Sequence, residues 1–166
     1  MSLMLCRSKK DYVRMAGIPY KEFEDTDFMY RMRSGHKGIA IIINNEKFDC
    51  ELNVVDRLSS LPQLKSLRSA LSYIGYKDIR IYTNLTGKEI CQLLKTVVDK
   101  DYRSRRMDSF FLGIFSYGDD RNIYAVDIML SHQMLMEPLR ALAHIPKIII
   151  VQAHQVDAQP SPVPSR

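Results

Sequence analysis

Two polar segments hold the side chains that could do chemistry, and each follows an apolar run. Ser116-Tyr117-Gly118-Asp119-Asp120 comes directly after the apolar residues 109–115, and Gln152-Ala153-His154 comes after residues 147–151. Nucleophilic catalysis needs a hydroxyl or thiol next to a base that activates it. No cysteine lies within two residues of His154, and a tyrosine hydroxyl, with an ordinary pKa near 10, is a weak base at pH 7. Tyr117 is therefore a poor general base, and the two segments offer no thiol nucleophile.

A metal site is the other chemistry that these segments suggest. His154 could be grouped with His132, His144 or Asp157. Zinc ligands in proteins follow characteristic short spacings of Cys and His, and these residues match none of them. We therefore expect no metal ion, and nothing in the sequence indicates a cofactor.

Composition and charge narrow the function classes. A chain of 166 residues with 46% apolar residues is typical of one folded domain. Its net charge of +5 comes from basic residues in scattered groups, which argues against a nucleic-acid interface. No apolar run is long enough to span a membrane, and the first residues do not resemble a secretory signal. Three cysteines at unrelated spacings, Cys6, Cys50 and Cys91, favour reduced thiols and a cytoplasmic location.

The elements that position the two polar segments can be predicted from apolar periodicity. Strands are expected at residues 38–43, 79–82, 109–115 and 147–151, because these are short, β-branched or aromatic apolar runs. Helices are expected at 61–74, ended by Gly75, at 87–98 after a Thr86-x-x-Glu89 capping box, and in a third stretch interrupted by Pro138. Alternating strands and helices predict an α/β fold with a parallel sheet covered on both faces. Met129, Met134 and Met136 are expected to pack in or near the core.

Several segments, in this order and spacing, resemble the large subunit of caspases. They are Tyr30-Arg31-Met32, residues 38–45, Asn84-Leu85-Thr86, Ser109-Phe110-Phe111, residues 116–120, Ile123-Tyr124, and Ile145-Pro146-Lys147-Ile148 leading to Gln152-Ala153-His154-Gln155. The similarity covers about residues 29–155. It implies a three-layer, Rossmann-like α/β fold with a mostly parallel sheet between helices, and only the large-subunit portion of it.

The same resemblance identifies two positions of the active site. Caspases have a catalytic histidine in Ser-His-Gly and a nucleophilic cysteine in Gln-Ala-Cys. Residue by residue, these positions fall on Tyr117 and His154. Gln155 resembles the form found in some initiator-type invertebrate caspases, whereas Val156 departs from the usual glycine. The resemblance therefore implies a pseudocaspase, in which neither member of the catalytic dyad is functional.

Three further residues match the binding apparatus of the family. Arg57 and Gln152 fall on the positions that line the pocket for the substrate aspartate, and Gly118 falls on the glycine whose N–H serves the oxyanion hole. The family follows this arginine with small residues and a glycine, whereas Leu58-Ser59-Ser60 stand here. A surface arginine and a turn glycine remain alternatives for Arg57 and Gly118.

The domain organisation follows from these assignments. We expect an N-terminal segment at 1–28, a caspase large-subunit-like domain at 29–154, and a flexible tail rich in proline and serine at 155–166. Active caspases add a small subunit to the same sheet. If the predicted strands run in the order 2-1-3-4, the strand at 147–151 has an open edge. We therefore expect a partner strand there, or a longer chain of which this sequence is a fragment.

The predicted function is regulatory rather than enzymatic. We expect a protein that modulates an active initiator caspase in apoptosis or innate immunity, through contacts with that caspase, its small subunit or adaptor proteins. Two alternatives remain: a cysteine-independent hydrolase that uses Tyr117 and His154, and a module that binds aspartate-containing peptides without cleaving them.

Overall fold

A four-stranded parallel sheet forms the centre of the molecule. The computed structural model describes residues 37–102, 107–142 and 145–154, and the strand order is β2-β1-β3-β6. The strands are β1 (Gly38–Asn44), β2 (Asp78–Thr83), β3 (Ser109–Tyr117) and β6 (Lys147–His154). The predicted α/β fold and 2-1-3-4 order are confirmed. The expected segments at 1–28 and 155–166, and the Tyr30-Arg31-Met32 motif, lie outside the described residues.

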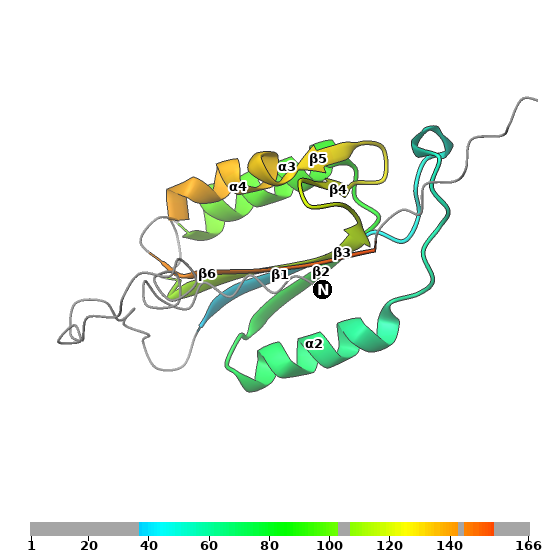
Figure 1. Cartoon of the computed structure of the whole chain (residues 1–166). Helices are drawn as coiled ribbons and strands as arrows, with labels where there is room; N and C mark the ends of the chain where they lie inside the picture. Colours follow the sequence, from blue (N-terminus) through cyan, green and yellow to red (C-terminus); the bar gives the residue numbers. More distant parts are fainter. Residues whose placement is uncertain (1–36, 103–106, 143–144, 155–166) are drawn as a thin grey trace, which may run out of the picture.

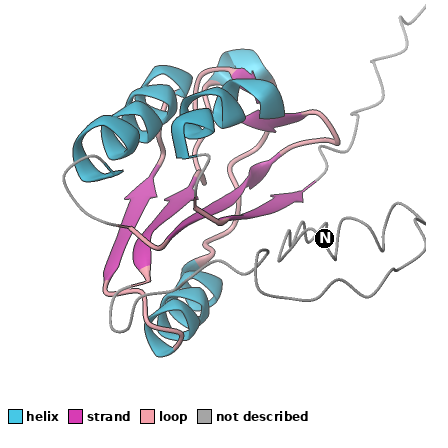
Figure 2. Ribbon diagram, turned by 90° about the vertical axis from the view of Figure 1, so that its left-hand side faces the viewer, coloured by secondary structure: helices cyan, strands magenta, loops and turns pink. Residues whose placement is uncertain are grey.

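Helices cover both faces of this sheet. Figure 1 shows α2 (Leu61–Tyr73) on one face, and α3 (Gly87–Thr96) with α4 (His132–Leu139) on the other. Figure 2 shows the same three layers from the side. Among the described residues, three short helical segments accompany these helices: η1 (Cys50–Leu52), the π-helical η2 (Val97–Tyr102) that continues α3, and η3 (Arg140–Leu142) after α4. Of the helices described, none has the length and apolar character that a bilayer crossing requires.

The core is divided by the sheet into two clusters, and β1 contributes to both. All seven residues of β1 are buried. Ile39, Ile41 and Ile43 pack with Leu94 of α3, whereas Ile42 packs with residues of α2 on the opposite face. Successive side chains of a strand point to opposite faces, so a strand buried on both sides is apolar at nearly every position; in β1 the one polar residue is Asn44, at its end. This explains the continuous β-branched run in the sequence.

The helix boundaries follow the local signals in the sequence. Thr86 and Glu89 form the predicted capping box at the start of α3: the Glu89 carboxylate accepts from the Thr86 N–H at 2.9 Å, and the Thr86 hydroxyl accepts from the Glu89 N–H at 3.3 Å. Gly75 has a φ of 106° just after α2, as a glycine that stops a helix typically does.

Two features differ from the sequence-based prediction. An antiparallel hairpin of β4 (Asn122–Tyr124) and β5 (Met129–Ser131) lies between β3 and α4, where the sequence predicts no strand. The expected core methionines are exposed: Met129 by 52%, Met134 by 48% and Met136 by 37%. The core prediction for them is wrong because Leu130 and Leu135 already turn inward from β5 and α4.

Candidate functional site

The two candidate dyad positions lie opposite each other at the carboxyl ends of neighbouring strands. β3 ends at Tyr117 and β6 ends at His154, and these residues are partners in the parallel register. The sequence predicted polar loops here, but both strands continue to these residues because the pairing of β3 with β6 extends to this point. Ligands of open α/β sheets bind at this edge, where the strands end.

Aromatic rings surround Tyr117. Its ring centroid lies 5.3 Å from that of Phe48, in a tilted arrangement, and 6.4 Å from that of Tyr124, nearly edge to face. Such arrangements of aromatic pairs are favourable beyond the area they bury. Tyr117 is half-buried, so its ring is part of the packing between the loop after β1 and the hairpin that begins with β4.

Arg57 is a buried arginine, not a surface one. It is only 9% exposed, and its guanidinium donates to the Asn45 carbonyl at 2.8 Å and to the Ser60 hydroxyl at 3.2 Å. Its Nε is buried without a hydrogen-bond partner among the described residues. Burial lowers the pKa of Arg57, opposed by the nearby Glu46 carboxylate and by Tyr117. Arg57 and Tyr117 therefore belong to one electrostatic neighbourhood.

Glu46 balances the buried charge of Arg57. Its carboxylate accepts from the Ser60 N–H at 2.7 Å. This bond, a second one from the Asn44 side chain and the charge of Arg57 together hold the pKa of Glu46 below its ordinary value, although partial burial opposes them. The main-chain carbonyl of Glu46 also accepts from the main-chain N–H of Arg57 at 2.8 Å. The segment that carries Arg57 is thus attached to the end of β1.

We expect the stability of the fold to depend on pH through Glu46. A carboxylate with a lowered pKa in the folded state stabilises the protein above its unfolded pKa of about 4.3 and loses that contribution as the pH falls through the folded pKa. Glu46→Gln should therefore cost about 1 kcal/mol at pH 7, reduced by solvent screening, and progressively less below about pH 4. Urea unfolding of both proteins at pH 7 and pH 3 measures this difference, and a cost that is the same at both values would contradict it.

Gly118 follows Tyr117 and is confined on two sides. A Cβ at this position would lie 2.7 Å from the Asn122 carbonyl oxygen and 3.0 Å from the Ala153 Cβ. Gly118 also forms a bridge to Ile123 that closes the turn before β4. The alternative that Gly118 is a turn glycine is therefore supported, because a larger residue would not fit here. Gly118 also lies against Ala153 of β6, next to position 154. Its predicted role as an oxyanion donor remains a prediction.

Gly118→Ala should destabilise the protein by about 1–3 kcal/mol, because the new methyl group overlaps main chain rather than a side chain that can move. The exposed Asp120, two residues further on, offers a control: Asp120→Ala should change stability by less than about 0.5 kcal/mol. Thermal unfolding of both variants distinguishes them, and an unchanged midpoint for Gly118→Ala would show that the turn can shift.

Gln152 lies near the end of β6 but is not joined to Arg57. It is the register partner of Phe115. It also continues the two-residue alternation of Ile148 and Ile150, whose side chains pack on the α2 side of the sheet. Gln152 therefore belongs to the α2 face, the side on which Phe115 packs. Among the described hydrogen bonds, none links Gln152 to the Arg57 guanidinium.

Two asparagines that organise the site were not identified from the sequence. Asn45, which is fully buried, donates from its side chain to the Tyr124 carbonyl at 3.2 Å and accepts from the Leu85 N–H at 3.0 Å. The Asn84 side chain accepts from the N–H groups of Glu46 and Lys47 at 2.9 and 3.0 Å. Asn-Asn after a strand is typical of a turn, and only its tertiary partners distinguish a turn from a buried clamp.

The loop after Gly118 is held by its own carboxylate. Asp119 accepts from the N–H groups of Arg121 and Asn122, both at 2.7 Å. The bond from the Arg121 N–H contributes most to keeping the pKa of Asp119 below its ordinary value, followed by the bonds from the Asn122 side chain and its N–H. Within the described part of the chain, no group of three or more His, Cys, Asp or Glu side chains could hold a metal ion.

Comparison of the sequence with known proteins identifies the family of this chain. The model of the caspase domain matches residues 37–165, which include every strand described above. The chain belongs to the caspase family. Tyr117 and His154 lie at the strand ends to which the sequence resemblance carries the caspase histidine and cysteine.

Individual caspases are similar over most of this chain. Caspase-6 of Gallus gallus is 27% identical over 144 residues, which cover 84% of this chain and 46% of the relative. Caspase-1-A of Xenopus laevis is 32% identical over 122 residues (71% and 30%), and caspase-3 of Mesocricetus auratus is 30% identical over 132 residues (76% and 47%). The chain thus spans at most about half the length of these curated relatives.

Proposed function

We propose that this chain is a catalytically inactive caspase homologue that regulates an active initiator caspase by protein–protein interaction in the cytoplasm. One observation carries the proposal: the register pairs a tyrosine with a histidine at the ends of β3 and β6, where the resemblance expects a histidine and a cysteine. Whether this pair could hydrolyse a peptide depends on the chemistry of a phenol and an imidazole.

A thiol protease needs a thiolate, and its imidazole partner stabilises that anion and later protonates the leaving amine. A phenol is a poor substitute for the imidazole, and an imidazole is a poor nucleophile towards an amide. Neither β3 nor β6 contains a cysteine; Cys50 lies in η1, and Cys91 in α3. In subtilisin, loss of the nucleophile or of its histidine costs about 10⁶ in kcat, so a residual peptidase activity of this chain should be negligible.

The open edge of β6 supports a role in protein contacts. Among the described strands, β6 pairs only with β3 and stands at the edge of the sheet. Its residues 147–153 are half-buried, with Ile149 and Val151 packed against the larger core cluster. An edge strand presents unpaired main-chain groups that another strand can join. We propose that the small subunit of an active caspase, or the caspase itself, pairs here; adaptor proteins are a further class of partner.

The test combines an activity assay with a binding assay. The protein alone should not hydrolyse fluorogenic peptides that end in aspartate, and Tyr117→Phe and His154→Ala should leave that result unchanged. Added to an active initiator caspase, the protein should change the rate of that enzyme in a saturable manner, and the two should co-elute in gel filtration. Turnover by the protein itself that disappears in His154→Ala would instead support the cysteine-independent hydrolase.

The unpartnered Nε of Arg57 favours a second candidate function, the capture of aspartate-containing peptides without cleavage. A guanidinium N–H that is buried without a partner can donate to a carboxylate. We expect saturable binding of a fluorescent Asp-ended peptide, and Arg57→Ala should weaken it by about 1.5–3 kcal/mol, the contribution of a charged hydrogen bond. The control is Arg140→Ala, which removes an exposed arginine side chain of η3 and should leave peptide binding unchanged. An absence of saturable binding would exclude this function, and binding that Arg57→Ala leaves unchanged would show that Arg57 is not the donor.

A further inference from the structure

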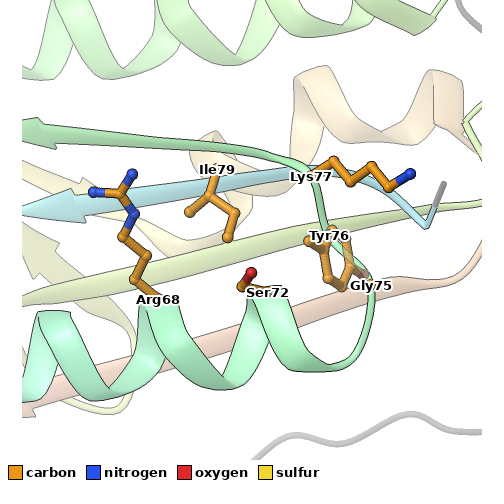
Figure 3. Close-up of a pocket in the computed structure, with 6 residues that line it drawn as sticks. All are labelled: Arg68, Ser72, Gly75, Tyr76, Lys77 and Ile79. Atoms are coloured by element: carbon orange, nitrogen blue, oxygen red, sulfur yellow. The ribbon is translucent and has the colours of Figure 1, made fainter.

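A groove between α2 and β2 lies away from the strand ends described above. Its volume is about 410 Å³, and it is lined by Arg68, Ser72, Gly75, Tyr76, Lys77 and Ile79. Figure 3 shows Arg68 rising from α2 at one end of the groove and Lys77 extending at the other, with Ile79 between them. The groove borders the beginning of β2, whereas the candidate dyad lies where β3 and β6 end.

The groove combines two positive charges with an apolar floor. Arg68 and Lys77 are exposed, and within the described part of the chain neither has an ion-pair partner. Ile79 and Tyr76 supply apolar surface between them. Carboxylates are the natural counterparts of a guanidinium and an ammonium group. The groove therefore fits an acidic segment that also carries an apolar side chain.

The chain itself contains such a segment close to the groove. Residues 22–27, Glu-Phe-Glu-Asp-Thr-Asp, carry four carboxylates and one aromatic ring and no basic residue. The described chain begins at the groove: the Lys37 N–H donates to the Gly75 carbonyl at 3.4 Å, and its side chain passes 3.1 Å from where a Gly75 Cβ would stand.

The length of the connection allows this segment to reach the groove. Ten residues from Asp27 to Lys37 span up to about 33 Å when extended, whereas the helical stretch from Gly75 back to Arg68 is only about 10 Å long. A short tether also raises the effective concentration of the segment at the groove to about the millimolar range. An acidic segment of another protein would have to compete with this advantage.

We propose that the groove between α2 and β2 binds residues 22–27 of the same chain, with their carboxylates on Arg68 and Lys77 and Phe23 against Ile79. This contact is separate from the proposed regulation of a caspase through β6.

Hydrogen–deuterium exchange of the full chain tests the proposal, with protection measured at the amides of residues 22–27. Arg68→Glu/Lys77→Glu should lower that protection at least about tenfold, as expected from the loss of a charged hydrogen bond. Lys88→Glu/Lys95→Glu, which reverses two exposed charges of α3 on the opposite face, should not change it. Adding Glu22→Lys/Glu24→Lys to the Arg68→Glu/Lys77→Glu protein should restore it.

A second set of variants keeps the result interpretable if the groove substitutions disturb folding. Glu22→Gln/Glu24→Gln/Asp25→Asn/Asp27→Asn leaves the groove intact and should lose the same protection, while the amides of β1 stay protected. Equal protection of residues 22–27 in all variants overturns the proposal. So does protection that increases with protein concentration, because the segment would then occupy the groove of a second copy.

Discussion

Gly38→Ala is expected to destabilise the fold by about 3 kcal/mol or more, a large part of the 5–15 kcal/mol by which such domains are typically stable. Gly38 has a φ of 128°, which L side chains rarely adopt. A Cβ at this position also overlaps the main-chain carbonyl of Ser109, at the point where β1 and β3 begin to pair. The Ser109 carbonyl cannot move aside without disturbing the sheet, so backbone strain and steric overlap add.

A second glycine in the same sheet provides the control for this prediction. Gly113 lies within β3, and a Cβ there would meet only side chains, the nearest being Phe111 at 3.2 Å and Leu67 at 3.4 Å. Gly113→Ala should therefore change stability by no more than about 1 kcal/mol, since those side chains can adjust. Urea unfolding of both variants gives the comparison. A similar loss in the two proteins would mean that Gly38 has no special role.

Much of this fold could be predicted from the sequence because its signals are local. The β-branched run at β1, the Thr86-x-x-Glu89 capping box and the glycine after α2 each specify an element through residues that are neighbours in the chain. The order of the parallel strands then follows from short, right-handed connections. The family resemblance added which strand ends to expect at the candidate site.

The features that were not predicted depend on contacts between distant residues. The hairpin of β4 and β5 is held by contacts with the start of α3. The Gly87 N–H donates to the Asp127 carboxylate at 2.7 Å, and a Cβ at Gly87 would collide with Ile128. Each of its strands has only three residues, too few for a period-2 pattern to be read. The burial of Arg57 likewise depends on Asn45, Ser60 and Glu46, which no spacing rule connects to it.

Asn45→Ala is the second substitution with a large expected effect, and it concerns the site directly. The Asn45 side chain is the common partner of Leu85, before α3, and of Tyr124 in β4. Its removal leaves the Leu85 N–H without its partner, whereas the Tyr124 carbonyl still accepts from the Ser116 hydroxyl at 2.6 Å. An unsatisfied group costs about 1–3 kcal/mol, and the bond to Tyr124 is lost as well, so we expect a loss of about 2–3 kcal/mol and a fall in Tm of about 5–10 °C.

Asn45→Asp separates the contribution that the side-chain N–H donor makes to stability from the contribution of side-chain size and shape. An aspartate keeps the acceptor for the Leu85 N–H but replaces the donor that faces the carbonyls of Leu85 and Tyr124 with a negatively charged oxygen. This variant should therefore be less stable than the wild type at pH 7 and should regain stability in acid, where a protonated carboxyl can donate again. Gln63→Ala, an exposed amide on α2, should have little effect. If Asn45→Asp were as stable as the wild type at pH 7, the clamp would not be what holds β4, and with it the Tyr124 ring, against Tyr117.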